Sequence, residues 1–327
     1  MKKFYFTILM ALLGLSLLGW ENEIQAVETY PARPITFIIP VEAGSDADLL
    51  ARPIAQKAST ILGQPIIVVN KPGAGMTIGF REIHAAKPDG YTIGLATGPI
   101  ITNKLQGLMP YDYRDYTTMG QYAIYIPIIV GSTKTQRPFK TIEEAISFAK
   151  SHPGEASVAT SGVGYLWWLA TVAFQEVAGI KLNIIPQAGA GALAMAQVAG
   201  GHTDLGVVAL ASAKSQIDAG NARFLAVIGP KRAPGYETIP ILRDVGCDVS
   251  IESPHIVIGP PKMPKDVTEQ LTRAFEKAAN DPEYQKFVIE RNGIPLYLPP
   301  EKVFQSLDEQ RKILRGIMEK AGILKEK

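Results

Sequence analysis

The sequence predicts an α/β protein with two domains, and three observations lead to this. Apolar runs typical of buried strands alternate with amphipathic, helix-like segments, which is the pattern of repeated β-α-β units. Two of the runs, residues 35–39 and 66–69, are each followed by a glycine-bearing loop and then by a helix-like segment. A chain of 327 residues is long enough for two domains or for one large one.

The first hundred residues after residue 26 carry strand and helix signals in turn. Strands are expected at 35–39, 66–69 and 91–96, and helices at 49–62 and 78–86. We expect Pro53 to kink the first helix and Gly63 to end it. This order of elements predicts a parallel sheet covered by helices.

A second α/β domain is expected further along the chain. Its strands are predicted at 157–160, 182–185, 205–208 and 224–228, and its helices at 142–150, 167–177 and 192–198. Thr141 is the expected N-cap of the first of these helices, with Glu144 as its capping-box partner. Three further helices are expected at 266–279, 282–291 and 300–321.

Two segments are expected to connect the domains. Residues 124–130 are apolar but contain Pro127, which fits a central strand poorly, so we expect a crossing strand there. Residues 256–258 are the expected return crossing. Hinges of a closing motion are therefore predicted near 125–129 and 253–258.

Residues 1–26 have the pattern of a secretory signal peptide. Lys2 and Lys3 give a charged start, residues 6–18 are apolar but short for a membrane span, and Ala26 offers a small residue for cleavage. The alternative is a retained membrane anchor, which the short run and the acidic residues after it disfavour. We therefore expect an exported protein that is cleaved near Ala26.

The charge and the cysteine content exclude several classes of protein. The net charge is +2 and stays +2 after cleavage, which is not typical of nucleic-acid binding. Cys247 is the only cysteine, so an internal disulfide and two-cysteine redox chemistry are excluded. The sequence contains no P-loop, no G-x-S-x-G and no H-E-x-x-H, and its four histidines are scattered. We therefore expect no enzyme, no cofactor and no metal site.

Several short motifs in fixed order resemble the solute-binding proteins of tripartite tricarboxylate transporters, the Bug-type receptors. They include Asn70-Lys-Pro-Gly-Ala-Gly75, Pro88-Asp-Gly-Tyr-Thr92, Leu108-Met-Pro-Tyr-Asp112 and Ser161-Gly-Val-Gly164, together with residues 30–35, 48–52, 78–79, 186–201 and 234–240. Each motif is weak by itself, but the set covers almost the whole chain after residue 26.

The resemblance implies a type II periplasmic-binding fold with two lobes, each a mostly parallel sheet with flanking helices, and two crossing hinge strands. The expected division is residues 27–127 and 256–327 for the first lobe and 128–255 for the second. The implied protein is a periplasmic monomer that binds a small organic acid between its lobes and delivers it to membrane permease subunits. In this family, main-chain groups and waters at the first-lobe loops hold the ligand carboxylate.

The chain departs from the family pattern in the first loop. Val41 replaces an aromatic residue, and Ser45 and Asp46 replace glycines. Glu42 and Asp46 add negative charge, although both could face solvent and Asp46 could cap the following helix. Asp48 matches the family, but it also suits a structural role as the i,i+4 partner of an arginine at position 52.

The second half of the chain departs as well. Tyr165, Trp167 and Trp168 replace small polar residues and a histidine, Gln187-Ala188 replaces Tyr-Lys, and Pro254-His255 replaces Trp-Phe. We expect one tryptophan in the core and one in the pocket, and leave a ligand contact and hinge packing both open for His255. The expected ligand-binding residues are Val41, Glu42, Ala43, Gly44, Ser45, Asp46, Asp48, Gly75, Met76, Thr77, Thr97, Ser161, Gly162, Val163, Gly164, Trp167, Trp168, Gln187, Ala209 and His255.

These departures lower the polarity and positive charge expected around the ligand. They predict a monocarboxylate, or an aromatic or longer-chain dicarboxylate, rather than a citrate-like tricarboxylate. A cationic or zwitterionic ligand held by Glu42 and Asp46 is an alternative. A receptor that presents its ligand to a sensor protein is another, and a hydrolase or isomerase on the same scaffold is disfavoured because no nucleophile-base pair is evident.

Overall fold

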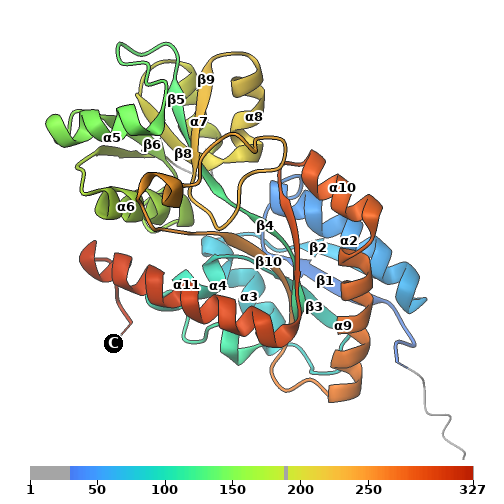
Figure 1. Cartoon of the computed structure of the whole chain (residues 1–327). Helices are drawn as coiled ribbons and strands as arrows, with labels where there is room; N and C mark the ends of the chain where they lie inside the picture. Colours follow the sequence, from blue (N-terminus) through green and yellow to red (C-terminus); the bar gives the residue numbers. More distant parts are fainter. Residues whose placement is uncertain (1–29, 188–190, 327) are drawn as a thin grey trace, which may run out of the picture. The chain divides into compact units, whose positions relative to one another are not determined.

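The computed structural model describes residues 30–187 and 191–326 (Figure 1). The expected signal peptide lies outside the described residues. Arg33–Lys327 forms one compact unit, which holds every element below. No helix within the described ranges combines the length and the apolar composition needed to span a bilayer.

The first sheet has six strands in the order β11-β4-β10-β3-β1-β2. In chain order they are β1 Ile35–Ile39, β2 Ile66–Asn70, β3 Thr92–Ala96, β4 Thr117–Tyr125, β10 Ser253–Gly259 and β11 Ile294–Leu298. Strand β1 pairs in parallel with β2 and β3, whereas β10 is antiparallel to β3 and β4, and β11 is antiparallel to β4.

The second sheet has five strands in the order β7-β6-β8-β5-β9. They are β5 Pro127–Ser132, β6 Ser157–Thr160, β7 Asn183–Pro186, β8 Leu205–Ala209 and β9 Ala222–Val227. Strand β6 is parallel to β7 and β8, and β5 is antiparallel to β8 and β9. Both sheets are therefore mixed rather than mostly parallel as expected, because the strands at the crossings enter each sheet from the opposite direction.

Helices flank both sheets, as expected for an α/β fold. The helices that follow strands of the first sheet or precede β11 are α2 Asp46–Leu62, α3 Thr77–Ala85, α4 Pro99–Leu105, α9 Lys265–Ala279, α10 Pro282–Glu290 and α11 Pro300–Lys320. Those of the second sheet are α5 Ile142–Ser151, α6 Leu166–Ala178, α7 Ala192–Ala199 and α8 Leu210–Asp218. In Figure 1 the second sheet and its helices lie uppermost, with α11 running below α6.

The crossing from the first sheet to the second takes a single residue, Ile126. Strand β4 ends at Tyr125, and β5 begins at Pro127 and pairs with β8 and β9. The predicted crossing strand at 124–130 is thus two strands in two sheets. Proline has no N–H for the ladder of β4, so the chain leaves that sheet there. The predicted return strand is β10, which lies wholly within the first sheet.

Helix α2 shows how local sequence sets an element that reaches the functional cavity. The Ser45 side chain accepts a hydrogen bond from the Asp48 N–H at 3.4 Å, so Ser45 rather than Asp46 is the N-cap. The helix starts three residues earlier than predicted and continues through Pro53 as one helix. It ends at Gly63, whose φ of 70° is left-handed.

The cap of α5 is half as expected. The Thr141 hydroxyl accepts from the Glu144 N–H at 3.2 Å, which is the predicted N-cap bond. The Glu144 carboxylate, however, accepts from the Lys140 N–H at 2.7 Å rather than from that of the cap residue, so the capping box is not closed.

Helices α4 and α8 and strand β11 were not predicted, and of β4 only the last two residues were. Helix α4 has seven residues, five of them buried, so it has no polar face that would give a helical period. Helix α8 follows β8 without a loop, which hides the boundary between the two elements.

Candidate functional site

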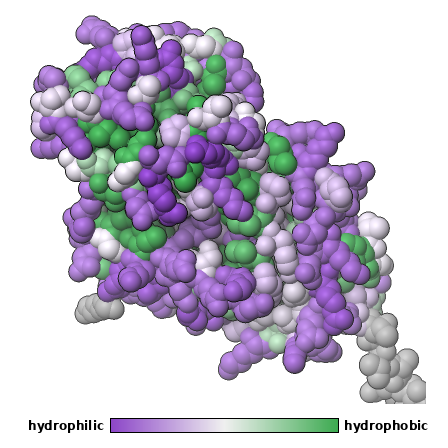
Figure 2. Space-filling model, in the orientation of Figure 1, coloured by the Kyte–Doolittle hydropathy of each residue, from purple (hydrophilic) through white to green (hydrophobic). Residues whose placement is uncertain are grey.

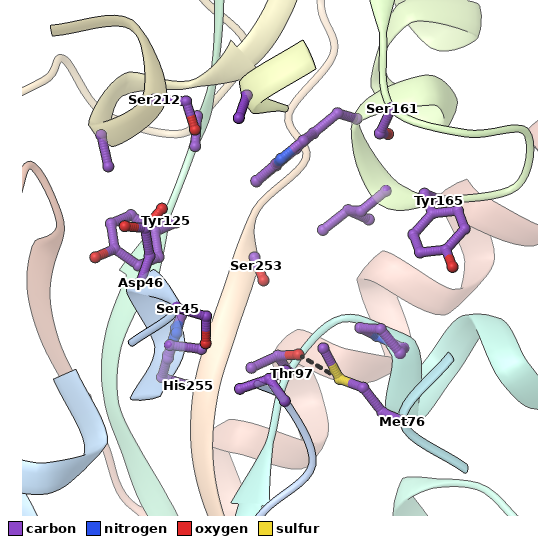
Figure 3. A pocket seen from close by; sticks show the side chains of 18 of the residues that line it. Ser45, Asp46, Met76, Thr97, Tyr125, Ser161, Tyr165, Ser212, Ser253 and His255 are labelled. Carbon is purple, nitrogen blue, oxygen red and sulfur yellow. Dashed lines mark hydrogen bonds between the residues drawn. The ribbon is translucent and has the colours of Figure 1, made fainter. Parts of the chain in front are cut away.

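A cavity of about 450 Å³ lies where residues of both sheets and of their helices come together (Figure 3). This volume suits a small organic molecule. The cavity is lined by Val41, Gly44, Ser45, Asp46, Ala47, Met76, Thr97, Pro99, Tyr125, Ser161, Tyr165, Leu166, Trp167, Ala192, Ala209, Ala211, Ser212, Ser253 and His255.

Helices α2, α3, α6, α7 and α8 all begin at this cavity, and so does the seven-residue helix α4. Residues of their first turns, or the caps just before them, are among the lining residues. The first N–H groups of a helix have no partner within the helix, and the helix dipole adds a partial positive charge at the same end. The N-termini of these five longer helices at one cavity favour an anionic group there.

No lysine or arginine is among the described residues that line the cavity. Asp46 is the one described lining residue with a carboxylate. Desolvation in the cleft raises the pKa of Asp46, and the nearby Arg291 guanidinium offsets this rise only in part. The positive potential of the cavity therefore comes from main-chain N–H groups rather than from side-chain cations.

Asp48 holds the two glycine-bearing loops together from beneath the cavity. Its buried carboxylate accepts hydrogen bonds from the Gly44 N–H at 2.9 Å, from Arg52 Nε at 2.8 Å and from Asn70 Nδ2 at 2.8 Å. Asn70 Nδ2 also donates to the Val41 carbonyl at 3.0 Å. Burial acts to raise the pKa of Asp48, but these hydrogen bonds outweigh it and the pKa is lowered. Asp48 was predicted to bind ligand, but it does not line the cavity, because its oxygens face these protein donors.

The second glycine-bearing loop turns Met76 into the cavity. Residues 73–76 all have positive φ, from 47° at Ala74 to 122° at Gly73. Asn103 Nδ2 fixes the turn by donating to the Gly75 carbonyl at 2.8 Å. Thr97 Oγ1 lies 3.4 Å from Met76 Sδ, so both predicted residues face the same space (Figure 3).

The two tryptophans at the start of α6 face different spaces. Trp167 is 9 % exposed and lines the cavity, so it is both a core residue and a wall of the site. Trp168 instead lines a groove between α6 and α11 with Val172 and Lys320. Figure 2 shows hydrophobic side chains gathered in this region, where α6 lies above α11. Ser161 Oγ accepts from the Trp168 N–H at 3.1 Å, which leaves its hydroxyl proton free for the cavity.

His255 lies in the cavity wall with 1 % of its surface exposed. Neither ring nitrogen has a hydrogen-bond partner among the described residues. Burial lowers its pKa to about 4, and a main-chain contact with Ser253 opposes this only in part. Its ring meets Tyr122 and Tyr125 edge-on, at centroid distances of 5.8 and 5.2 Å. Both of the open interpretations therefore have a structural basis: His255 packs at the crossing and also faces the cavity.

Half of the predicted ligand-binding residues line the cavity, and half do not. Those that line it are Val41, Gly44, Ser45, Asp46, Met76, Thr97, Ser161, Trp167, Ala209 and His255. Those that do not are Glu42, Ala43, Asp48, Gly75, Thr77, Gly162, Val163, Gly164, Trp168 and Gln187. Most of the second group share a loop or a helix start with lining residues but point elsewhere; Glu42, Ala43 and Val163, for example, are exposed to solvent.

The lining residues that were not predicted are Ala47, Pro99, Tyr125, Tyr165, Leu166, Ala192, Ala211, Ser212 and Ser253. Tyr165 departs from the family pattern in the sequence, but it was not among the predicted ligand-binding residues. Tyr125 and Ser253 border the two crossings, and that position was a usable signal, because a ligand between two lobes must lie near the strands that connect them.

Comparisons with known proteins give matches over most of the chain. Residues 50–323 match the model of the tripartite tricarboxylate transporter family receptor. The chain is similar to Protein BugT of Bordetella pertussis, with 26 % identity over 97 % of this chain and 98 % of that protein. It is also similar to the UPF0065 protein in the gbd 5′ region of Cupriavidus necator, with 28 % identity over 97 % and 96 %.

Solved structures show the same fold. A TctC solute-binding protein from Polaromonas superposes with a TM-score of 0.79 at 29 % identity, covering 89 % of this chain and 100 % of that one. Rpa4515 of R. palustris, solved with adipate, gives a TM-score of 0.77 at 25 % identity, over 90 % and 99 % of the two chains. The architecture is therefore that of periplasmic solute-binding proteins of this type.

Proposed function

Because this chain belongs to the tripartite tricarboxylate transporter family of receptors, we propose that it binds a small carboxylate in the cavity between its sheets and delivers it to a transporter of that family. The family consists of solute-binding receptors rather than enzymes. The observation that carries the proposal is the convergence of five helix N-termini, those of α2, α3, α6, α7 and α8, on a cavity with one carboxylate and no lysine or arginine among its described lining residues.

The same observation supports a ligand of low charge. Main-chain N–H groups and helix dipoles can hold one carboxylate, as they do at many anion sites. Three carboxylates would need more positive charge than such groups supply, and Asp46 adds repulsion. Trp167, Leu166 and Met76 offer apolar surface to the rest of the molecule. A monocarboxylate, or an aromatic or longer-chain dicarboxylate, is therefore favoured over citrate. The adipate bound to Rpa4515 supports this chemical class.

Calorimetry with hexanoate, benzoate, adipate and citrate tests this proposal. We expect at least one of the first three to bind and citrate to bind weakly or not at all. Replacing Ser161 by Ala removes a free hydroxyl donor and should weaken binding by about tenfold, which is the effect of one hydrogen bond. Ser147→Ala, on the exposed face of α5, is the matched control. Tight binding of citrate with the other three acids inert would contradict the proposal.

We place the protein in the periplasm as a monomer that is cleaved near Ala26. The family supports the location. N-terminal sequencing of the exported protein and light scattering of the purified protein test the cleavage and the monomer. Delivery to a permease is tested by uptake of the bound acid in cells with and without the gene for this chain.

A further inference from the structure

We infer that the ligand carries a hydrogen-bond donor, a hydroxyl or an ammonium group, at the end opposite its carboxylate, and that Asp46 accepts from this donor. The inference rests on the proposed function, because it assigns the second end of a carboxylate ligand. It also gives the ligand an orientation across the cavity.

The helix ends around the cavity are not equivalent. The first turn of α2 already contains two carboxylates, those of Asp46 and Asp48. The first turns of α3, α6, α7 and α8 contain no acidic residue. A ligand carboxylate is therefore stabilised at the ends of these four helices and repelled at the end of α2. This difference places the carboxylate of the ligand away from Asp46.

Asp46 differs from Asp48 in having acceptor capacity to spare. Three protein donors satisfy Asp48, as described above. The Asp46 carboxylate has no ion pair or hydrogen bond within the described part of the chain. Arg291 is near enough to influence it electrostatically but makes no ion pair with it. A carboxylate that faces a cavity in this state is suited to accept a hydrogen bond from a ligand.

The side of the cavity opposite Asp46 is formed by Tyr165, Ser161 and the start of α6. Figure 3 shows Asp46 beside Tyr125 on one side and Tyr165 on the other, with Ser253 between them. Ser161 and the start of α6 lie on the side of Tyr165 (Figure 3). An extended ligand whose carboxylate reaches the Ser161 hydroxyl thus directs its other end toward Asp46.

His255 cannot neutralise a second carboxylate near Asp46. With a pKa of about 4 it is uncharged at neutral pH. A neutral imidazole donates one hydrogen bond and accepts another, and both of its nitrogens are unpartnered within the described residues and nine-tenths or more buried. His255 therefore suits a ligand that has both a hydrogen-bond acceptor and a hydrogen-bond donor. Asp46 likewise suits a ligand with a donor. A distal carboxylate would leave Asp46 facing a like charge.

Four acids with the same six-carbon chain test the inference: hexanoate, 6-hydroxyhexanoate, 6-aminohexanoate and adipate. Their affinities are measured by calorimetry at one pH and salt concentration. We expect the wild type to bind the hydroxy or the amino acid at least about tenfold more tightly than adipate, the scale of one charge-assisted hydrogen bond. If the amino acid binds best, the donor is an ammonium group; if the hydroxy acid binds best, it is a hydroxyl.

Asp46→Asn is the decisive variant, and Glu42→Gln is its matched control. Each removes one negative charge from an exposed side chain at or just before the start of α2, but only Asp46 lines the cavity. Asp46→Asn should reduce the preference over adipate by about tenfold, and Glu42→Gln should leave it unchanged. The ranking of the four acids by the wild type needs no variant, so the inference stays testable if Asp46→Asn folds poorly.

The outcomes separate the two proposals. If adipate binds the wild type as tightly as the hydroxy and amino acids, and Asp46→Asn changes no ratio, the inference is wrong while carboxylate binding stands. If none of the four acids binds, and benzoate and the other acids of the first test also fail, the proposed function itself is wrong. An equal loss of preference in both variants would show a general charge effect and would also overturn the role of Asp46.

Discussion

Asp46 and Asp48 are two residues apart at the start of α2 but have opposite surroundings. Asp48 is 1 % exposed and bonded to two loops, whereas Asp46 faces the cavity. A helix turns by about 100° per residue, so two residues two positions apart lie on nearly opposite faces. The inner face of this first turn is therefore structural and the outer face is available for a ligand.

Asp48→Asn is expected to destabilise the fold by about 3 kcal/mol at pH 7, because it removes a charge and weakens three hydrogen bonds in a buried setting. The lowered pKa means that this stabilisation is complete above the unfolded value near 3.8 and is lost as the pH falls through the folded value. Urea unfolding at pH 7 and pH 3 should show the difference shrinking in acid. Asp218→Asn, an exposed i,i+4 pair with Lys214, is the control and should have a much smaller effect. An Asp48→Asn protein as stable as that control would contradict the role of Asp48.

Burial of His255 in its neutral form should also make the stability of the fold depend on pH. In the unfolded chain the imidazole of His255 takes up a proton as the pH falls below its ordinary pKa of 6.5. In the folded protein the same imidazole stays neutral until the pH falls to about 4. Stability due to this group is therefore complete above pH 6.5 and falls as the pH falls toward 4, by roughly 2 kcal/mol at pH 4.5. Comparison of His255→Phe with the wild type at pH 7 and pH 4.5 measures this loss, with exposed His152→Gln as control. A titration of His255 near pH 6.5 by NMR would contradict it.

Helices α4 and α6 meet at one rim of the cavity. Gln106 Nε2, just after α4, donates to the Gly164 carbonyl before α6 at 3.0 Å. A Cβ at Gly98 would lie 2.9 Å from Leu166 Cδ2, so the glycine gives Leu166 the space to pack there. Both Pro99 and Leu166 line the cavity, and this contact therefore shapes one wall of the site.

Gly98→Ala should change ligand affinity more than stability. Leu166 can yield by turning its side chain, which costs less than about 1 kcal/mol of stability but moves an apolar wall of the cavity. We expect the tightest-binding acid to lose several-fold in affinity by calorimetry. Gly316→Ala is the control: it lies within α11 with open space around it, so it should raise stability by about 0.5–1 kcal/mol and leave binding unchanged. Unaltered affinity in Gly98→Ala would show that the rim does not shape the site.

The chain passes from the first sheet to the second and back again. It leaves at Ile126 and re-enters the first sheet at Ser253, the start of β10. Tyr125 and Ser253 are neighbours in the first sheet, since they pair across β4 and β10. A rotation about these two adjacent points would change the width of the cavity without breaking either sheet.

We therefore predict closure around the ligand, with the two sheets and their helices as the moving bodies. Small-angle scattering should show a smaller radius of gyration when the protein is saturated with the acid that binds best. The control is the Ser161→Ala variant at a ligand concentration too low to saturate it, which should keep the ligand-free radius. An unchanged radius for a saturated wild type would contradict the closure.

Local patterns along the chain were enough to predict the family, the α/β class and the two loops that contribute to one wall of the cavity. In these patterns, apolar runs predict strands, and glycine-bearing loops follow two of these runs. The sequence also identified Asp46 and His255 as unusual residues, and both line the cavity.

Which side chains near these loops and helix starts face the cavity depends on how the elements pack together. Asp46 and Asp48 have the same side chain in the same turn, and Trp167 and Trp168 are adjacent, so no local pattern separates the residue at the cavity from its neighbour. Tyr125, Ser212 and Ser253 join the site from β4, α8 and β10, elements far apart in sequence. Their direction is set by packing between elements, which depends on contacts at long range and not on the order of neighbouring residues.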